Sequence, residues 1–139
     1  MDTRSIARTI LSFVSGKTII VVEDDAMTAQ LVADVVASLG HRVEIASGVE
    51  RAVALAAAHA PAAMLVDLHL GTESGLDLIS ELAAEPLTVR IPIIAMTALD
   101  DPEVLADLDR AGVVAILEKP FAAADIAALV QAVLDAGAK

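Results

Sequence analysis

The chain has 139 residues, of which 57% are hydrophobic and only 1% aromatic, a length and composition that fit one domain with an aliphatic core. Its net charge of −11 argues against direct binding of a nucleic-acid backbone and favours a cation or a basic protein face as the partner. The sequence has no cysteine, no uninterrupted apolar run of about 18 residues and no signal-peptide pattern, because Arg4, Arg8 and Lys17 interrupt its N-terminal apolar stretch. We therefore expect a cytoplasmic protein with no disulfide, no thiolate metal site and no membrane contact.

Residues 1–16 precede the regular pattern of the chain and form an amphipathic segment. Its apolar side chains recur at helical spacing, at Ile6, Ile10, Phe13 and Val14. We predict a helix over residues 3–14 with Phe13 largely buried, set apart from a main domain over residues 17–139. A helix this short needs a surface to pack on. The last predicted helix offers one, within the chain or in a second copy, and the second case would make a homodimer. A frayed tail is the alternative.

After Lys17 the chain alternates short β-branched runs with longer helical stretches. Runs of apolar residues without alternation are typical of strands that are buried on both faces of a sheet. Five strands are predicted, over Thr18–Val22, Arg42–Ala46, Ala62–Val66, Ile91–Met96 and Val113–Leu117. Five helices are predicted, most of them ending at a glycine or before a proline, over Ala26–Leu39, Gly48–His59, Ser74–Glu85, Asp101–Ala111 and Ala122–Ala136. The pattern predicts an α/β fold with a doubly wound five-stranded parallel sheet and helices on both faces.

Acidic side chains follow two of the predicted strands. Glu23, Asp24 and Asp25 come directly after the first strand, and Asp67 follows the third. In an open parallel sheet the carboxyl ends of the strands meet at one edge, which is where ligands bind. Carboxylates from two strands make an oxygen-rich pocket of the kind that Mg²⁺ uses. The metal would offset the repulsion among these acids.

A hydroxyl and a cation follow the two remaining strands that reach this edge. Thr97 comes after the fourth predicted strand, and Lys119 follows the fifth. A lysine and a hydroxyl beside a metal suit the oxygens of a phosphoryl group. Taken singly, each polar residue could be a helix cap, a turn residue or a solvated charge, and we assign Asp25 to the cap of the next helix. Together, one on each of several strands, they predict a functional site.

Four segments, in this order, resemble the signatures of response regulator receiver domains: "IIVVEDD", "MLVDLHL", "PIIAMTA" and "EKPF". The resemblance covers roughly residues 17–136 and implies the flavodoxin-like receiver fold. It also implies a phosphoacceptor of two-component signalling or of a phosphorelay. Such a domain is not an enzyme beyond its own phosphorylation and dephosphorylation. Its implied partners are a histidine kinase or histidine phosphotransfer protein and a downstream protein target, with no direct nucleic-acid contact.

The resemblance also implies a role for each site residue. Asp67 would accept the phosphoryl group and bind Mg²⁺, with Mn²⁺ as a substitute. Asp24 would bind the metal directly, Glu23 would bind it through a water, and the backbone carbonyl of His69 would be a further ligand.

The other two roles concern the phosphoryl group itself. Thr97 would hydrogen-bond one of its oxygens and Lys119 would pair with another. The Lys119–Pro120 peptide bond would be cis, which directs the lysine at this site. An ionised carboxylate needs no general base to attack phosphorus, so positioning and charge neutralisation are the main demands on the site.

Three positions depart from the family pattern. Gly71 stands where the family usually has proline, which removes no catalytic atom. Ile116 stands where the family often has tyrosine or phenylalanine, so the resemblance implies the phosphorylation pocket but not the usual aromatic readout. His69 takes a position whose side chain affects access of the hydrolytic water, and we expect its ring to be a surface group. His41 and His59 lie at predicted helix ends away from the site, and we interpret both as structural.

Three other functions fit parts of the pattern. A nucleotide-binding enzyme would need a glycine-rich turn after the first strand, and "EDDAMT" has no glycine. A Mg²⁺-dependent aspartyl-nucleophile phosphatase matches the spacing of Glu23 and Asp25 but leaves Asp67 unexplained. A receiver-like adaptor that works independently of phosphorylation is the hardest alternative to separate. If the chain is complete at Lys139, we expect its output to be protein contact or onward phosphotransfer.

Overall fold

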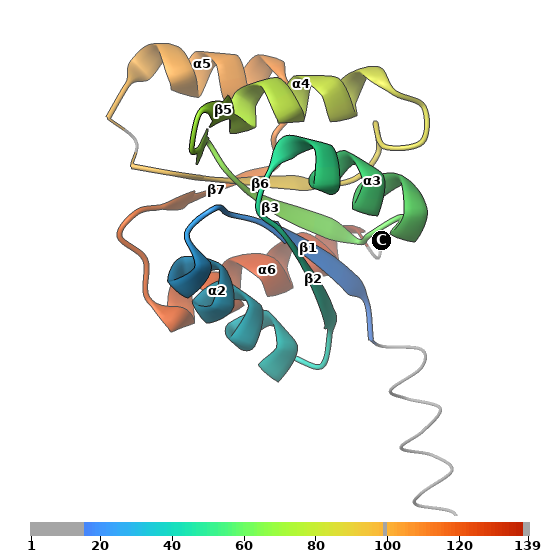
Figure 1. Ribbon diagram of the computed structural model, residues 1–139. Helices are drawn as coiled ribbons and strands as arrows, with labels where there is room; N and C mark the ends of the chain where they lie inside the picture. Colours follow the sequence, from blue (N-terminus) through green and yellow to red (C-terminus); the bar gives the residue numbers. More distant parts are fainter. Residues whose placement is uncertain (1–15, 99, 138–139) are drawn as a thin grey trace, which may run out of the picture.

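The computed structural model describes residues 16–98 and 100–137, and Figure 1 shows one sheet with helices on both of its faces. The main sheet has five parallel strands in the order β2-β1-β3-β6-β7. Its strands are β1 (Thr18–Val22), β2 (Arg42–Ala46), β3 (Ala63–Asp67), β6 (Ile93–Thr97) and β7 (Ala115–Glu118). The strand order, with β1 inside the sheet and crossovers in both directions, confirms the doubly wound parallel fold.

The helices of the described residues divide between the two faces of the sheet (Figure 1). On one face lie α2 (Ala26–Ser38) and α6 (Ala123–Gly137). On the other lie α3 (Val49–His59), α4 (Gly75–Ala84) and α5 (Pro102–Arg110). No helix in this part of the chain is both long and apolar enough to cross a membrane. The helix predicted over residues 3–14, including the burial of Phe13, lies outside the described residues and stays a prediction.

The core consists of two layers, one on each side of the sheet. Along β1, Ile20 and Val22 contact the layer under α3, α4 and α5, whereas Ile19 and Val21 contact the layer under α2 and α6. All four side chains are fully buried. Because both faces of the strand are covered, every position must be apolar, which explains the unbroken hydrophobic runs in the sequence.

The bounds of β1 and β2 match the prediction, whereas those of β3, β6 and β7 differ from it by one or two residues. β3 and β6 extend to Asp67 and Thr97, because a polar residue at the end of a strand can still pair with its neighbour. β6 starts only at Ile93, since Pro92 has no N–H to donate to a ladder. β7 starts later than predicted because the Val113 N–H is already bonded to Leu108 O, at the end of α5.

Three predicted helix starts prove to be caps. Gly48, Ser74 and Asp101 have extended backbone and precede α3, α4 and α5, so each helix begins one residue later than predicted. Likewise, Leu39 is the C-cap of α2, not its last residue. Gly40 then has a φ of 94°, as expected for a glycine that ends a helix.

A two-stranded hairpin after β3 was not predicted. Its strands, β4 (His69–Leu70) and β5 (Glu73–Ser74), are antiparallel, and Gly71 in the turn has a φ of 65°. Each strand has only two residues, too few for a periodic pattern to appear in the sequence. The hairpin links the end of β3 to the start of α4 and lies beside the site described next.

Candidate functional site

The parallel sheet brings the predicted site residues to its carboxyl edge. Asp67 is the last residue of β3 and Thr97 the last of β6, while Glu23 directly follows β1 and Lys119 directly follows β7. The strand register fixes the positions of these residues along the strand direction, because Val22 is opposite Val66 and Asp67 is opposite Met96. Residues far apart in the chain thus lie at one edge, as the sequence predicted.

Three carboxylates form a compact cluster there. Oxygens of Glu23, Asp24 and Asp67 all lie within 4.8 Å of one another. Glu23 and Asp67 are buried, whereas Asp24 is exposed. Glu23 Oε1 accepts the Asp25 N–H at 3.2 Å, but Glu23 Oε2 is buried without a hydrogen-bond partner among the described residues. A buried carboxylate oxygen that accepts no hydrogen bond, beside two other carboxylates, fits a divalent cation with oxygen ligands, and the exposed side of the cluster is open to its waters.

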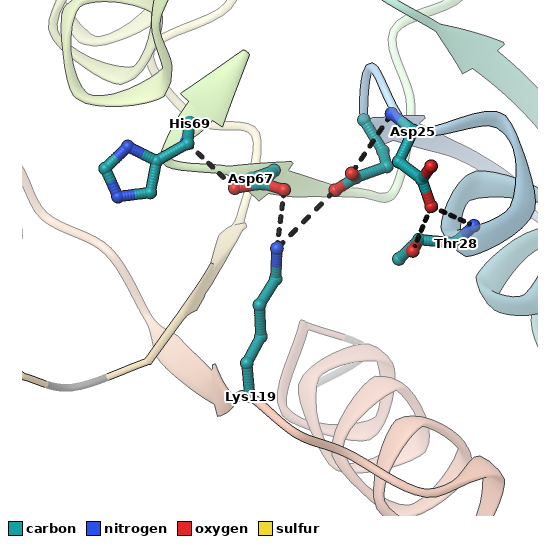
Figure 2. A network of polar contacts seen from close by, with 6 residues as sticks. Asp25, Thr28, Asp67, His69 and Lys119 are labelled. Atoms are coloured by element: carbon teal, nitrogen blue, oxygen red, sulfur yellow. Dashed lines mark hydrogen bonds and ion pairs between the residues drawn. The ribbon is translucent and has the colours of Figure 1, made fainter. Parts of the chain in front are cut away.

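Lys119 lies across this cluster. Its Nζ is 2.6 Å from Asp67 Oδ2 and 3.9 Å from Glu23 Oε2. The other carboxylate oxygen of this residue, Asp67 Oδ1, accepts the His69 N–H at 2.8 Å. Figure 2 shows Asp67 between these two donors, with the His69 ring turned away from it. The Asp67 side chain is therefore fixed through both of its oxygens, and the imidazole is exposed, as expected for a surface ring.

Thr97 is held next to Lys119 through the backbone. The Lys119 N–H donates to the Thr97 carbonyl at 2.8 Å, and Thr97 is opposite Glu118 in the β6–β7 pair. The Thr97 side chain is almost fully buried, with 6% of its surface exposed. The Lys119–Pro120 peptide bond is cis, which confirms the prediction. The hydroxyl and the ammonium thus come from adjacent strand ends.

The two buried acids differ in their pKa values. Burial raises the pKa of Glu23 to about 8, and the nearby Asp67 carboxylate adds to the rise while Lys119 opposes it. For Asp67, burial alone would raise the pKa, but its contacts with Glu23, Lys119 and the His69 N–H outweigh that effect and lower it. Near neutral pH, Asp67 is therefore ionised. Burial thus favours the protonated form of Glu23, and a cation bound at the cluster would favour the ionised form.

Asp25 is a helix cap, as predicted. Its Oδ2 accepts the Thr28 N–H at 2.9 Å and the Thr28 hydroxyl at 2.6 Å (Figure 2), and these hydrogen bonds lower the pKa of Asp25. Its carboxylate is thus committed to the first turn of α2. The third acid of the sequence run serves the helix, and the first two serve the cluster.

The remaining histidines lie away from the cluster. His41 precedes β2 and accepts the Lys17 N–H on Nδ1 at 3.2 Å, and His59 is the last residue of α3. Both positions lead into the amino ends of strands, opposite the site edge, which agrees with a structural role. Ile116 is half-buried in β7 and packs against the core layer under α3, α4 and α5.

Comparisons with known proteins agree with this geometry. The family model "Response regulator receiver domain" matches residues 19–131. The phosphate regulon transcriptional regulatory protein PhoB of Pseudomonas aeruginosa is 31% identical over 119 residues, which cover 86% of this chain and 52% of PhoB. The chain thus spans about half the length of this curated relative.

Solved structures show the same fold. The receiver domain of the sensor histidine kinase PA1611 from Pseudomonas aeruginosa, solved with a magnesium ion coordinated in the active site cleft, is 29% identical with a TM-score of 0.77. The match covers 86% of this chain and 98% of that domain. The chemotaxis response regulator CheY4 of Vibrio cholerae has a TM-score of 0.79 at 21% identity, over 85% and 98% of the two chains, and supports the fold alone. The family model matches most of the chain, and the acidic cluster of Glu23, Asp24 and Asp67 agrees with it. The chain therefore belongs to the response regulator receiver domain family.

Proposed function

We propose that the chain accepts a phosphoryl group on Asp67 from a phosphohistidine of a partner histidine kinase or histidine phosphotransfer protein. The observation that carries this proposal is the state of Asp67. Its carboxylate is buried yet ionised, with one oxygen 2.6 Å from Lys119 Nζ and carboxylates of Glu23 and Asp24 close by. This combines a nucleophile, a cation and a metal-binding cluster at one point.

The chemistry needs no proton acceptor. An oxygen of the Asp67 carboxylate forms the new bond to phosphorus, and the bond from phosphorus to the donor imidazole nitrogen breaks. The electron pair stays on that nitrogen, and the leaving imidazole is neutral because its other nitrogen carries a proton. Lys119, now paired with Asp67, exchanges that contact for a phosphoryl oxygen, and the Thr97 hydroxyl donates to another.

The acid cluster would hold Mg²⁺, or Mn²⁺ in its place. Asp24 and Asp67 would bind it directly, Glu23 through a water, and the His69 carbonyl would complete the protein ligands. When bound, the ion neutralises charge on the phosphoryl oxygens. The magnesium in the cleft of the similar PA1611 receiver domain supports this assignment.

The output of the phosphorylated chain would be contact with a downstream protein in the cytoplasm. The domain would act as a signalling switch that turns over no other substrate. Ile116 would take the place of the usual aromatic ring in any change of conformation that transmits phosphorylation to the downstream protein.

Labelling by acetyl phosphate tests the proposal. Wild type incubated with Mg²⁺ should gain the mass of one phosphoryl group, as measured on the intact protein, and EDTA should prevent the gain. Asp67→Asn should not be labelled. Asp34→Asn, which removes an exposed carboxylate from α2, should be labelled like wild type. Unlabelled wild type would favour the phosphorylation-independent adaptor, and a labelled Asp67→Asn protein would contradict the acceptor assignment.

A further inference from the structure

The β4–β5 hairpin is built against the acceptor and the acid cluster. At its base, the Gly75 N–H donates to Leu68 O at 3.0 Å, and a Cβ on Gly75 would lie 2.0 Å from the Asp67 carbonyl oxygen. At its tip, a Cβ on Gly71 would lie 3.6 Å from Asp24 Oδ2. The hairpin therefore contacts the acceptor backbone at one end and a carboxylate of the cluster at the other.

Glu73 connects this hairpin to a separate helix. Its Oε1 accepts the Val49 N–H at 3.2 Å, in the first turn of α3. The N-cap of α3 is Gly48, which makes no side-chain cap, and a Cβ there would lie 2.7 Å from Glu73 Oε1. The first N–H groups of a helix need acceptors from outside the helix. The carboxylate of Glu73 thus supplies, from 24 residues away, the acceptor that Gly48 lacks.

We propose that Glu73 is a positioning residue for phosphorylation of Asp67, an inference that rests on the proposed function. Glu73 is opposite Leu70 in the hairpin, next to the pair of His69 and Ser74. A hairpin of two-residue strands has little stability of its own. The inner face of α3 is buried in the core, so the helix is a firm anchor. The hydrogen bond from the Val49 N–H to Glu73 therefore fixes the hairpin, including the strand that carries His69 and the turn beside Asp24.

A purely structural role would be limited to capping α3. The two roles can be separated at Gly48, whose φ of −156° and ψ of 176° are extended backbone that any residue adopts. A serine at this position can cap α3 with its own hydroxyl. The double variant E73A/G48S thus restores a cap to the helix without restoring the connection between the helix and the hairpin.

The experiment measures the rate of Asp67 labelling by acetyl phosphate with saturating Mg²⁺, together with the melting temperature. The rate of E73A should fall roughly three- to tenfold, a modest part of the roughly hundredfold loss that an atomic misplacement of about 1 Å can cause. E73Q keeps the acceptor oxygen and should regain most of the rate. E73A/G48S should recover the melting temperature but stay slow. Glu50→Ala removes an exposed carboxylate from the same first turn without touching the hairpin, and should label at the wild-type rate.

The outcomes separate this inference from the proposed function. Absence of labelling in wild type would refute the proposed function itself. With wild type labelled, three results would overturn the role of Glu73: E73A labelling at the wild-type rate, E73Q as slow as E73A, or E73A/G48S recovering its rate together with its melting temperature.

Discussion

Glu23, Asp25 and Asp67 lie near one another but differ in their surroundings and in their pKa values. Asp25 is exposed and bonded to Thr28, so it caps a helix. Glu23 and Asp67 are both buried, but the Lys119 ammonium lies 2.6 Å from Asp67 and 3.9 Å from Glu23. Burial is the main cause that raises the pKa of Glu23, whereas the contacts of Asp67 with Glu23, Lys119 and the His69 N–H lower the pKa of Asp67.

Divalent cations should stabilise the fold without any phosphoryl donor. The carboxylates of Glu23, Asp24 and Asp67 are clustered only in the folded state, so a cation that binds them shifts the unfolding equilibrium. At a Mg²⁺ concentration ten times Kd, the free energy of unfolding should rise by about 1.4 kcal/mol. Thermal melts with and without Mg²⁺ measure the effect. Asp24→Asn should lose it and Asp34→Asn should keep it, and equal responses in these two variants would contradict the cluster as the binding site.

His41 should make stability fall in mild acid. Burial, with the nearby Lys17 charge, lowers the pKa of His41 below its ordinary value of 6.5. Above that pH the ring is neutral in both states, and it contributes no pH dependence. As pH falls below it, the unfolded chain binds the proton first, so the free energy of unfolding decreases. Protonation would also remove the Nδ1 acceptor of the Lys17 N–H.

The matched control for this pH effect is His41→Asn, which keeps an acceptor for the Lys17 N–H but does not titrate. Urea unfolding at several values between about pH 7.5 and pH 5.5 gives the stability of both proteins. Wild type should lose more stability than His41→Asn across this range. Because other groups titrate in both proteins, their difference isolates His41, and parallel pH profiles would refute the assignment.

At the scale of elements, the sequence predicts strands and helices well and their junctions less well. The β1 and β2 bounds match the prediction because polar residues flank both strands, Lys17 and Glu23 for β1 and His41 and Ser47 for β2. The starts of β6 and β7 do not match, because Pro92 and the bonded Val113 N–H remove donors that hydrophobicity does not report. The β4–β5 hairpin could not be predicted, since two residues per strand give no period. Gly71, with its φ of 65°, marks the turn in the sequence.

The N-cap of α5 offers a direct stability test. Asp101 Oδ1 accepts the Glu103 N–H at 2.9 Å, and Pro102 occupies the first turn. Asp101→Ala removes the acceptor and should lower the free energy of unfolding by about 1 kcal/mol. Asp101→Asn keeps an oxygen in place and should change it much less. Chemical denaturation of the three proteins checks this, and equal losses in both variants would show that the side-chain bond is not the cause.

At the scale of the molecule, topology makes the site predictable. Once the chain is recognised as a parallel sheet, residues that follow different strands must meet at its carboxyl edge, and Glu23, Asp67, Thr97 and Lys119 do so. No comparable topological rule predicts the contacts that flexible side chains make between elements. The bond from Glu73 to the first turn of α3, and the position of Lys119 between two acids, depend on rotamers and packing that the pattern does not encode.

The segment ahead of the sheet should affect stability or assembly but not phosphorylation. Its predicted apolar stripe includes Ile10 and Phe13. These side chains stabilise the folded state only if the helix packs them against a surface. Deleting residues 1–15 should leave labelling of Asp67 intact and lower the melting temperature or change the molar mass by light scattering. The double variant Ile10→Ser/Phe13→Ser, made in the 139-residue chain, should behave like the deletion. If both match wild type in both measurements, the segment is a passive tail.

Identifying the residue that carries the phosphoryl group tests the role of Asp67 most directly. Borohydride reduces an aspartyl phosphate to homoserine, and tandem mass spectrometry of the digested protein then identifies the residue that carried it. Treatment with acetyl phosphate and Mg²⁺ should give homoserine at position 67 and leave the acids at positions 23, 24 and 25 unmodified. Homoserine at any of those three positions, or none at 67 in a protein whose intact mass shows the phosphoryl group, would contradict this role of Asp67.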